Sequence, residues 1–184
     1  MIRLHRLDHV CLRVADLDEA SARWQLQFAL VERSREGGRA LLACNDEPYC
    51  LELVEGGSPG HDHFAFELAR DCSLDDARAH FGERGVEWEE REGSLFVDDP
   101  DGRPVQVMPY RAPAGQTGRW PQHARPSTTA HLDGARKLGH VNCLTGDIQA
   151  GFRFYTEVLG MGLSDWLGEA GVWFHINTDH HVMA

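Results

Sequence analysis

The sequence predicts an α+β fold made of repeated βαβββ modules, whose strands form curled mixed sheets with helices on their outer surface. Three observations predict it: a long internal repeat, a shorter repeat inside its first copy, and the same order of strand and helix patterns in each copy. With 184 residues, the chain is long enough for one complete two-module domain and half of a second, because domains commonly contain about 100–150 residues.

The long repeat relates LDHVCLRVADLDEASARW, which starts at Leu7, to LGHVNCLTGDIQAGFRFY, which starts at Leu138, at an offset of 131 residues. Leu, His, Val and Asp recur at identical places in the two copies. A shorter repeat relates DHVCLRV to DHFAFEL, which starts at Asp62, at an offset of 54 residues. Repeats of this size indicate duplicated modules of about 50 residues rather than the turns of a solenoid.

The first module shows the element order most clearly. Alternating apolar residues, among them Val10 and Leu12, predict a strand. Asp16 predicts the N-cap of a helix whose apolar residues, including Trp24 and Phe28, lie at helical spacing. The segments GGRALLACN and PYCLELVEG, each bounded by Gly, Pro or Asn, then predict short strands.

The later modules repeat this order. In the second, DHFAFEL predicts a strand, residues 74–84 a helix, and VEWEEREG, SLFVDD and PVQVMPY further strands, with a DPDG turn at residues 99–102. Residues 112–136 are rich in Pro, Gly, Thr and Ala and predict a linker. We therefore expect an N-terminal domain over residues 1–111, and the first module of an incomplete C-terminal domain over residues 137–184.

Composition narrows the class of partner. Lys and Arg total 18 against 29 Asp and Glu, and the formal charge of −11 disfavours both nucleic acid and anionic membrane surfaces as partners. No apolar run approaches the roughly 20 residues of a membrane span, and the start of the chain lacks the apolar stretch of a signal peptide. We expect a cytoplasmic protein.

The cysteines favour reduced, packed thiols over a zinc finger. There are five, an odd number, and they are scattered without a CxxC pair. They are Cys11, Cys44, Cys50, Cys72 and Cys143.

Three histidines, His9, His63 and His140, occupy the same inward-alternating place on the first strand of each module. One such histidine taken alone is more typical of a packed core residue than of a metal ligand. Glu52 and Gln106 alternate with apolar neighbours and are expected beside His9 and His63. This set can bind divalent iron, zinc, nickel or manganese, or its members can hydrogen-bond one another in a remnant cleft.

The third module carries a second group of polar residues. Asn142 follows His140 by two residues and therefore lies on the same side of a strand. We expect a hairpin over VWFHINTDHHVMA, with His180 on one face. Alternation places on the other face Trp173, His175, Asn177, Asp179 and His181.

At these residues the chain resembles the vicinal-oxygen-chelate superfamily, which includes glyoxalases, bleomycin resistance proteins and dioxygenases and is built from paired βαβββ modules. More specifically, it resembles the type I extradiol dioxygenases, two-domain enzymes that open the ring of a catechol with non-haem Fe(II). The resemblance covers nearly the whole chain. Its most specific parts are RKLGHVNCLTGDIQAGFRFYTEVLGMGL and WFHINTDHHVMA.

The resemblance implies a role for each residue of the third module. His140 matches the first iron ligand, His181 matches a second-sphere histidine that acts as acid and base, and Asn142 is expected near bound dioxygen and substrate. Trp173 and His175 are expected to line the substrate pocket. The implied cofactor is Fe(II), with Mn(II) as the alternative, and the implied reactants are a catechol-type diol and O2.

The chain departs from the family in what it lacks. By repeat logic the other two ligands would lie about ten and about fifty residues past Ala184. We therefore expect a fragment of a longer enzyme that is inactive as given, and the remaining interpretations are a split enzyme completed by another chain and a dead remnant. An unfinished module also predicts pairing with a second chain or a homo-oligomer.

Two other function classes stay open. The first is a glyoxalase-like metal-dependent isomerase or lyase that uses His9, Glu52, His63 and Gln106 of the N-terminal domain. In the extradiol enzymes this domain is a metal-free copy, which would make its histidines relics. The second is a non-enzymatic protein that binds a small molecule or confers resistance to it.

Overall fold

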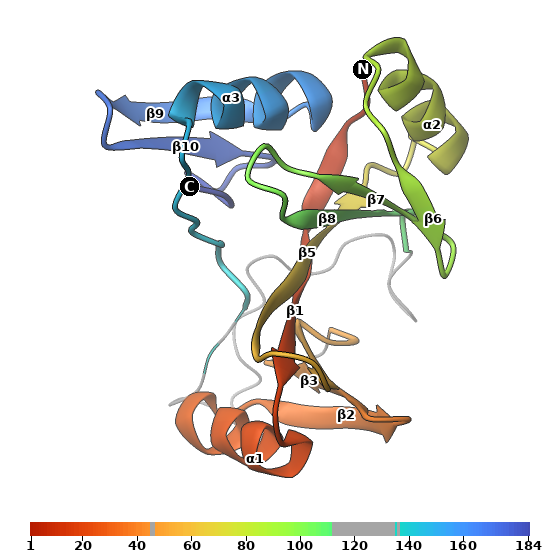
Figure 1. Cartoon of the computed structure of the whole chain (residues 1–184), viewed down its shortest axis with the longest axis vertical. Coiled ribbons are helices and arrows are strands. Elements are labelled where there is room, and N and C mark those ends of the chain that lie inside the picture. The colour runs from red at the N-terminus through yellow and green to blue at the C-terminus, as the bar shows by residue number, and fades with distance from the viewer. Residues whose placement is uncertain (45–46, 112–134, 136) are drawn as a thin grey trace. The chain divides into compact units, whose positions relative to one another are not determined.

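The computed structural model describes residues 1–44, 47–111, 135 and 137–184 (Figure 1). Apart from Ala135, the predicted linker over residues 112–136 lies outside the described residues. The chain divides into two compact units. Unit 1 contains Met1–Leu7, Phe64–Arg111 and Gly139–Ala184, and unit 2 contains Asp8–His63 and Ala112–Leu138. The predicted domain boundaries stay a prediction.

The first module contains one helix and four strands. They are β1 (Leu4–Val14), α1 (Leu17–Phe28), β2 (Val31–Glu36), β3 (Arg39–Ala43) and β4 (Leu51–Glu55). The predicted cap is present, because the Asp16 side chain accepts a hydrogen bond from the backbone N–H of Glu19. The sequence did not single out β2, which reads VERSRE and is largely exposed, so it has no apolar alternation.

The second module repeats the order of the first. Its elements are β5 (Gly60–Leu68), α2 (Leu74–Glu83), β6 (Glu89–Arg91), β7 (Ser94–Asp98) and β8 (Pro104–Met108). Ser73 and Asp76 form a capping box at the start of α2. The predicted DPDG turn is closed by a 2.8 Å hydrogen bond from the N–H of Gly102 to the carbonyl of Asp99.

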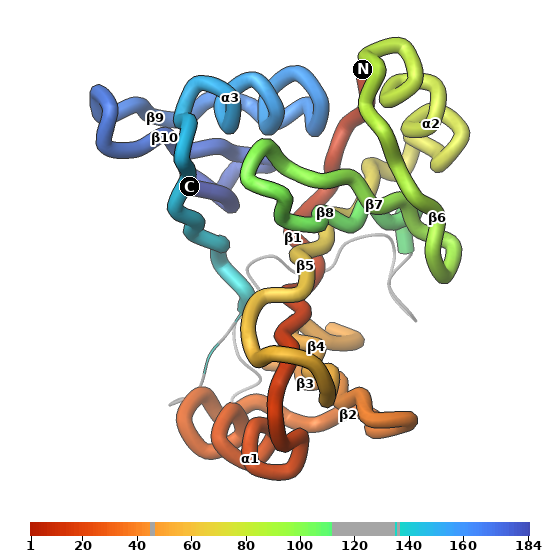
Figure 2. The backbone as a smooth tube through the Cα atoms, viewed as in Figure 1, coloured from red at the N-terminus to blue at the C-terminus, as the bar shows by residue number. Residues whose placement is uncertain are grey.

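The strands form a mixed sheet in the order β2-β3-β4-β1-β5-β8-β7-β6. β1 is parallel to β4 and β5 is parallel to β8, whereas the hairpin pairs β2/β3, β3/β4, β6/β7 and β7/β8 are antiparallel. Both β1 and β5 contribute residues to unit 1 and to unit 2, and each is a continuous strand (Figure 2). The predicted α+β fold of paired βαβββ modules is confirmed.

The third module belongs to unit 1 and follows the first at the predicted offset. It contains α3 (Ile148–Arg153), the short π-helix η1 (Phe154–Val158), β9 (Gly162–Leu167) and β10 (Gly171–His175). In Figure 1, α3 lies alongside the hairpin of β9 and β10. Aromatic contacts join them, because the ring of Phe152 lies 5.3 Å from that of Trp166 and 6.3 Å from that of Phe174.

The first strand predicted for this module is not a regular strand. Only Val141 makes a β-bridge there, parallel to Met183 and supported by hydrogen bonds to Val182 and Ala184. In the first module the equivalent strand, β1, has a long pairing with β4. Within the described residues, this segment pairs with the rest of the module only through that isolated bridge.

The core of unit 2 lies under α1 and is formed by apolar residues of α1, β3, β4 and the residues that flank these elements. Its buried members are Leu17, Leu30, Ala40, Leu42, Cys44, Cys50, Leu51 and Leu53. All five cysteines are free thiols, as predicted. No helix among the described residues combines the length and the apolar character needed to cross a membrane.

Candidate functional site

Three side chains from three strands of unit 2 converge on one buried point. His9 lies on β1, Glu52 on β4 and His63 on β5, and they are 1%, 2% and 7% exposed. The two Nε2 atoms lie 3.3 Å apart, and Oε2 of Glu52 lies 3.5 Å from Nε2 of His9. The three potential ligand atoms all lie within 4.8 Å of one another. We call this group the His9 cluster.

The opposite ring nitrogen of each histidine is held by its preceding residue. Nδ1 of His9 lies 2.8 Å from a carboxylate oxygen of Asp8, and Nδ1 of His63 lies 2.8 Å from one of Asp62. A carboxylate accepts hydrogen bonds, so each Nδ1 carries the proton and each Nε2 presents its lone pair to the centre of the cluster. Burial lowers the pKa of His63, which favours this neutral form.

Glu52 adds a carboxylate oxygen in the same place. Its Oε1 pairs with Nε of Arg39 at 2.5 Å, whereas its Oε2 is buried and has no hydrogen-bond partner among the described residues. Two facing lone pairs and an unpartnered carboxylate oxygen repel one another unless a cation lies between them. The donor set of two imidazoles and one carboxylate, each imidazole oriented by a second carboxylate, suits a divalent transition metal.

Gln106, the fourth member of the predicted N-terminal set, lies on β8 in unit 1. It is buried and pairs in register with Ala65 and Phe96. Its Oε1 has no hydrogen-bond partner among the described residues. Its role as a ligand stays a prediction.

The structure brings together His140 and His181, which are 41 positions apart in the sequence. Their ring centroids lie 4.6 Å apart, because Val141, which follows His140, donates its N–H to the carbonyl of Val182, which follows His181. Burial, followed by the neighbouring charges of His140 and His180, lowers the pKa of His181, which favours its neutral form. His140 and Asn142 are exposed rather than inward, because no described element covers this side of the bridge.

The prediction that alternation separates His180 from His181 is wrong. β10 ends at His175, and a turn follows in which the Asn177 side chain accepts a 2.8 Å hydrogen bond from the N–H of Asp179. Alternation therefore stops before the two histidines. Their Nδ1 atoms lie 3.0 Å apart, with the rings perpendicular.

Trp173 and His175 lie on β10, where both are half-buried and alternate with the buried residues Val172 and Phe174. Nδ1 of His175 lies 2.7 Å from the hydroxyl of Ser164 on the neighbouring strand. The indole of Trp173 lies against Gly171. The side of β10 that faces away from the buried residues therefore presents an aromatic and a histidine side chain, as alternation predicts for these two positions.

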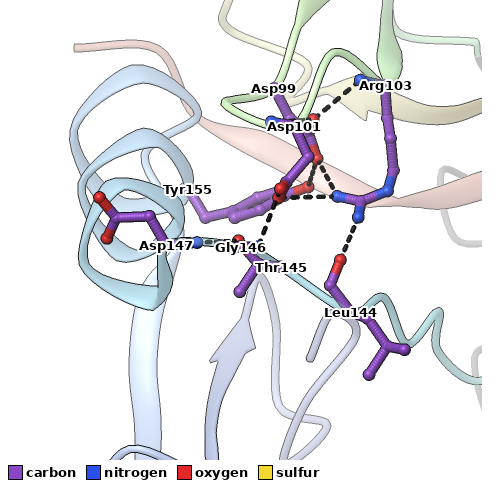
Figure 3. A network of polar contacts seen from close by, with 8 residues as sticks. All are labelled: Asp99, Asp101, Arg103, Leu144, Thr145, Gly146, Asp147 and Tyr155. Carbon is purple, nitrogen blue, oxygen red and sulfur yellow. Dashed lines mark hydrogen bonds and ion pairs between the residues drawn. The ribbon is translucent and has the colours of Figure 1, made fainter.

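Sequence reasoning missed the polar network that joins the second and third modules within unit 1 (Figure 3). Asp99 is buried, and its carboxylate accepts hydrogen bonds from the backbone N–H groups of Asp101 and Arg103, from the Arg103 guanidinium and from the Tyr155 hydroxyl. Arg103 also donates to the carbonyl of Leu144. The sequence signal at this network is the DPDG motif, which by itself predicts only a turn.

Comparison with known proteins agrees with this architecture. Residues 137–184 match the family model described as the Glyoxalase/Bleomycin resistance protein/Dioxygenase superfamily. A catechol-2,3-dioxygenase from Bacillus subtilis is 25% identical over 171 residues, covering 82% of this chain and 60% of the relative. The chain therefore spans about three fifths of that relative's length.

Two solved structures share the fold at low identity. An Mn(II)-bound glyoxalase from Novosphingobium aromaticivorans matches with a TM-score of 0.79 at 20% identity. The match covers 100% of this chain and 62% of the glyoxalase chain. An extradiol ring-cleaving dioxygenase from B. fuscum matches with a TM-score of 0.79 at 21% identity. The match covers 99% of this chain and 53% of the dioxygenase chain. The resemblance of this chain to the glyoxalase/bleomycin resistance protein/dioxygenase superfamily is confirmed, and its fold is the vicinal-oxygen-chelate fold of that superfamily.

Proposed function

We propose that this chain is part of an extradiol ring-cleavage dioxygenase that acts on a catechol-type diol and O2 with divalent iron, or manganese, as cofactor. The observation that carries the proposal is the pairing of His140 with His181, whose rings lie 4.6 Å apart inside the segment that matches the family model. The relative named as a catechol-2,3-dioxygenase supports the choice of reaction.

In this proposal His140 is a metal ligand and His181 is the acid and base. A neutral His181 would take a proton from the diol and return one later in the reaction. The Asn142 amide would donate to bound oxygen, and Trp173 and His175 would line the pocket. When bound, the metal would supply open positions for both reactants and a path for electron density between them.

The proposed site needs two more ligands, which the repeat predicts in a further module. We propose further that the whole protein has this activity, that this chain by itself is inactive, that it pairs with another chain, and that its location is cytoplasmic. The test uses the protein that carries this chain together with any residues that follow it.

The experiment measures oxygen uptake with substituted catechols together with bound iron. His140→Ala should remove iron and activity together. His181→Asn should retain iron and lower kcat by about 10²–10⁴-fold, the usual contribution of a general acid or base. His5→Ala is the control, because His5 packs against Tyr110 and contacts neither His140 nor His181, so it should leave kcat close to that of the parent. Unchanged kcat in His181→Asn would contradict the proposal.

A second candidate rests on the His9 cluster, which offers a complete set of two histidines and one carboxylate in the chain itself. The unpartnered Oε2 of Glu52 and the two Nε2 lone pairs fit a divalent cation. This observation favours a glyoxalase-like isomerase or lyase, in which His9, Glu52 and His63 would hold a metal that would supply Lewis acidity toward the substrate. The Mn(II)-bound glyoxalase that shares this fold supports a divalent metal in it.

Metal content separates the candidates. Loss of bound metal in His140→Ala but not in His9→Ala would support the dioxygenase. Loss only in His9→Ala would exclude it in favour of the second candidate, and loss of half the metal in each would indicate two centres. His5→Ala provides the control on β1, because His5 packs against Tyr110 and belongs to neither group. Retained binding of a small aromatic ligand without any metal would support the third class, a binding protein.

A further inference from the structure

We propose that Cys44, Glu47 and Cys50 form a binding site for a thiophilic divalent cation, of which Zn²⁺ is the expected example. Cys44 directly follows β3, Cys50 directly precedes β4, and Glu47 lies between them in the connection. The proposal is independent of both candidate functions, because it uses none of the residues assigned to either.

Strand pairing brings the two thiols together. β3 and β4 are antiparallel with Leu42 opposite Leu51, and the N–H of Cys50 donates to the carbonyl of Leu42 at 2.8 Å. The residues just beyond this pairing, Cys44 and Cys50, must therefore lie close to one another. Both belong to the buried cluster under α1, so packing fixes them on the same side of the hairpin.

The distances match those of a shared metal ligand set. The two Sγ atoms lie 3.7 Å apart, and two thiolates bound at about 2.3 Å to a tetrahedral Zn²⁺ would be about 3.8 Å apart. Oε1 of Glu47 lies 3.0 Å from Sγ of Cys44, and all three ligand atoms lie within 4.8 Å of one another. A disulfide would require the sulfur atoms to approach to about 2.05 Å.

The chemistry of the group selects the kind of ion. Cys44 and Cys50 are 7% and 5% exposed, so the two sulfur atoms are largely shielded from water. Thiolate sulfur is a soft ligand that favours zinc and similar ions, whereas the imidazoles and carboxylate of the His9 cluster suit iron or manganese. Three protein ligands leave one tetrahedral position for a water molecule, which the partly exposed side of Glu47 can admit.

An ion at this site would tie together both ends of the connection between β3 and β4. Tyr49 lies in this connection next to Cys50, and its ring lies 4.8 Å from that of His9. The proposed site would therefore also fix the aromatic side chain that packs on the His9 cluster.

The test is a titration of the reduced, chelator-treated protein with Cd²⁺ alone, followed by the ultraviolet thiolate-to-cadmium charge-transfer band. The parent should develop the band with one equivalent. Cys44→Ser and Cys50→Ser should each weaken binding by more than about 100-fold, because loss of a direct ligand exceeds the usual 10–100-fold effect of an outer-shell change. Glu47→Gln should retain the band and bind more weakly.

Three controls make the result specific. Cys72→Ser and Cys143→Ser remove thiols outside the site, and His9→Ala removes a ligand of the other cluster, so all three should retain the band. Circular dichroism of the metal-free serine variants checks that they fold like the parent. Absence of the band in the parent, its persistence in folded Cys44→Ser, or conversion of the pair to a disulfide with loss of two hydrogen masses during the titration would overturn the proposal.

Discussion

Replacement of Asp99 by alanine should destabilise the join between the second and third modules more than any conservative change around it. The Asp99 carboxylate accepts four hydrogen bonds (Figure 3). Two come from backbone N–H groups, one from the Arg103 guanidinium at 2.8 Å and one from the Tyr155 hydroxyl at 3.1 Å. All four donors lose their acceptor in Asp99→Ala.

The magnitude follows from which donors can find another partner. Arg103 is partly exposed and still contacts Asp101 and Leu144, so water and these neighbours replace much of its loss. The Tyr155 hydroxyl is buried and would be left without its acceptor, at a cost of about 1–3 kcal/mol. Adding the lost charge-assisted bonds to backbone N–H groups, we expect Asp99→Ala to lower the free energy of unfolding by about 3–5 kcal/mol.

Chemical denaturation at pH 7, followed by tryptophan fluorescence, measures this difference. Tyr155→Phe should cost only about 1 kcal/mol, because Asp99 keeps three of its four donors. Asp98→Ala is the matched control, since this exposed neighbour at the end of β7 should change stability by less than about 0.5 kcal/mol. The reasoning is refuted if Asp99→Ala is no more destabilising than Tyr155→Phe.

Three further predictions concern local structure. Gly160 has φ +71°, and a Cβ there would lie 2.6 Å from the carbonyl oxygen of Ile2, whereas Gly168 has φ +51° and open space around it. Gly168→Ala should therefore lower the free energy of unfolding by about 1–2 kcal/mol, and Gly160→Ala should lower it by more. Thermal unfolding of both variants checks the ranking. Burial lowers the pKa of His80 despite its hydrogen bond to a backbone carbonyl. The unfolded chain therefore takes up this proton first, and the stabilising contribution of neutral His80, present above about pH 6.5, is lost as pH falls. His80→Gln should accordingly lose less unfolding free energy than the parent between pH 7 and 5, and equal slopes would contradict this assignment. Ser73→Ala removes half of the capping box of α2 and should cost about 1 kcal/mol in urea unfolding, whereas no change would show that the cap contributes nothing.

Much of the fold was predictable because its signals are local. The repeat that starts at Leu7 and Leu138 predicted that the third module would follow the first, and α1 and α3 begin at Leu17 and Ile148, at the same offset of 131 residues. Caps and apolar periodicity predicted most of the elements. Strand β2 was missed because its exposed sequence VERSRE has no apolar alternation. The prediction of a regular first strand in the third module was wrong, because a strand needs a pairing partner, which local sequence does not specify.

The residues of the candidate sites were likewise predictable where the signal is local and were missed where tertiary contacts bring them together. Alternation along β4 and β5 predicted that Glu52 and His63 lie beside His9, and these three residues do converge. It failed for His180 and His181, since alternation holds only while the backbone stays extended and β10 ends at His175. The proximity of Cys44 to Cys50 was missed, because their spacing matches no familiar motif and only the hairpin of β3 and β4 brings them together.

By itself, the sequence determined the modular architecture, the residue types of each polar group and the resemblance to the superfamily, because periodicity, capping and repetition act over short distances along the chain. The tertiary structure decided which nitrogen and oxygen atoms face one another. The facing Nε2 atoms of His9 and His63, the unpartnered oxygen of Glu52 and the hydrogen bond of Tyr155 to Asp99 all depend on contacts between segments far apart in the sequence. Such contacts are fixed by packing in three dimensions, for which a linear pattern carries no signal.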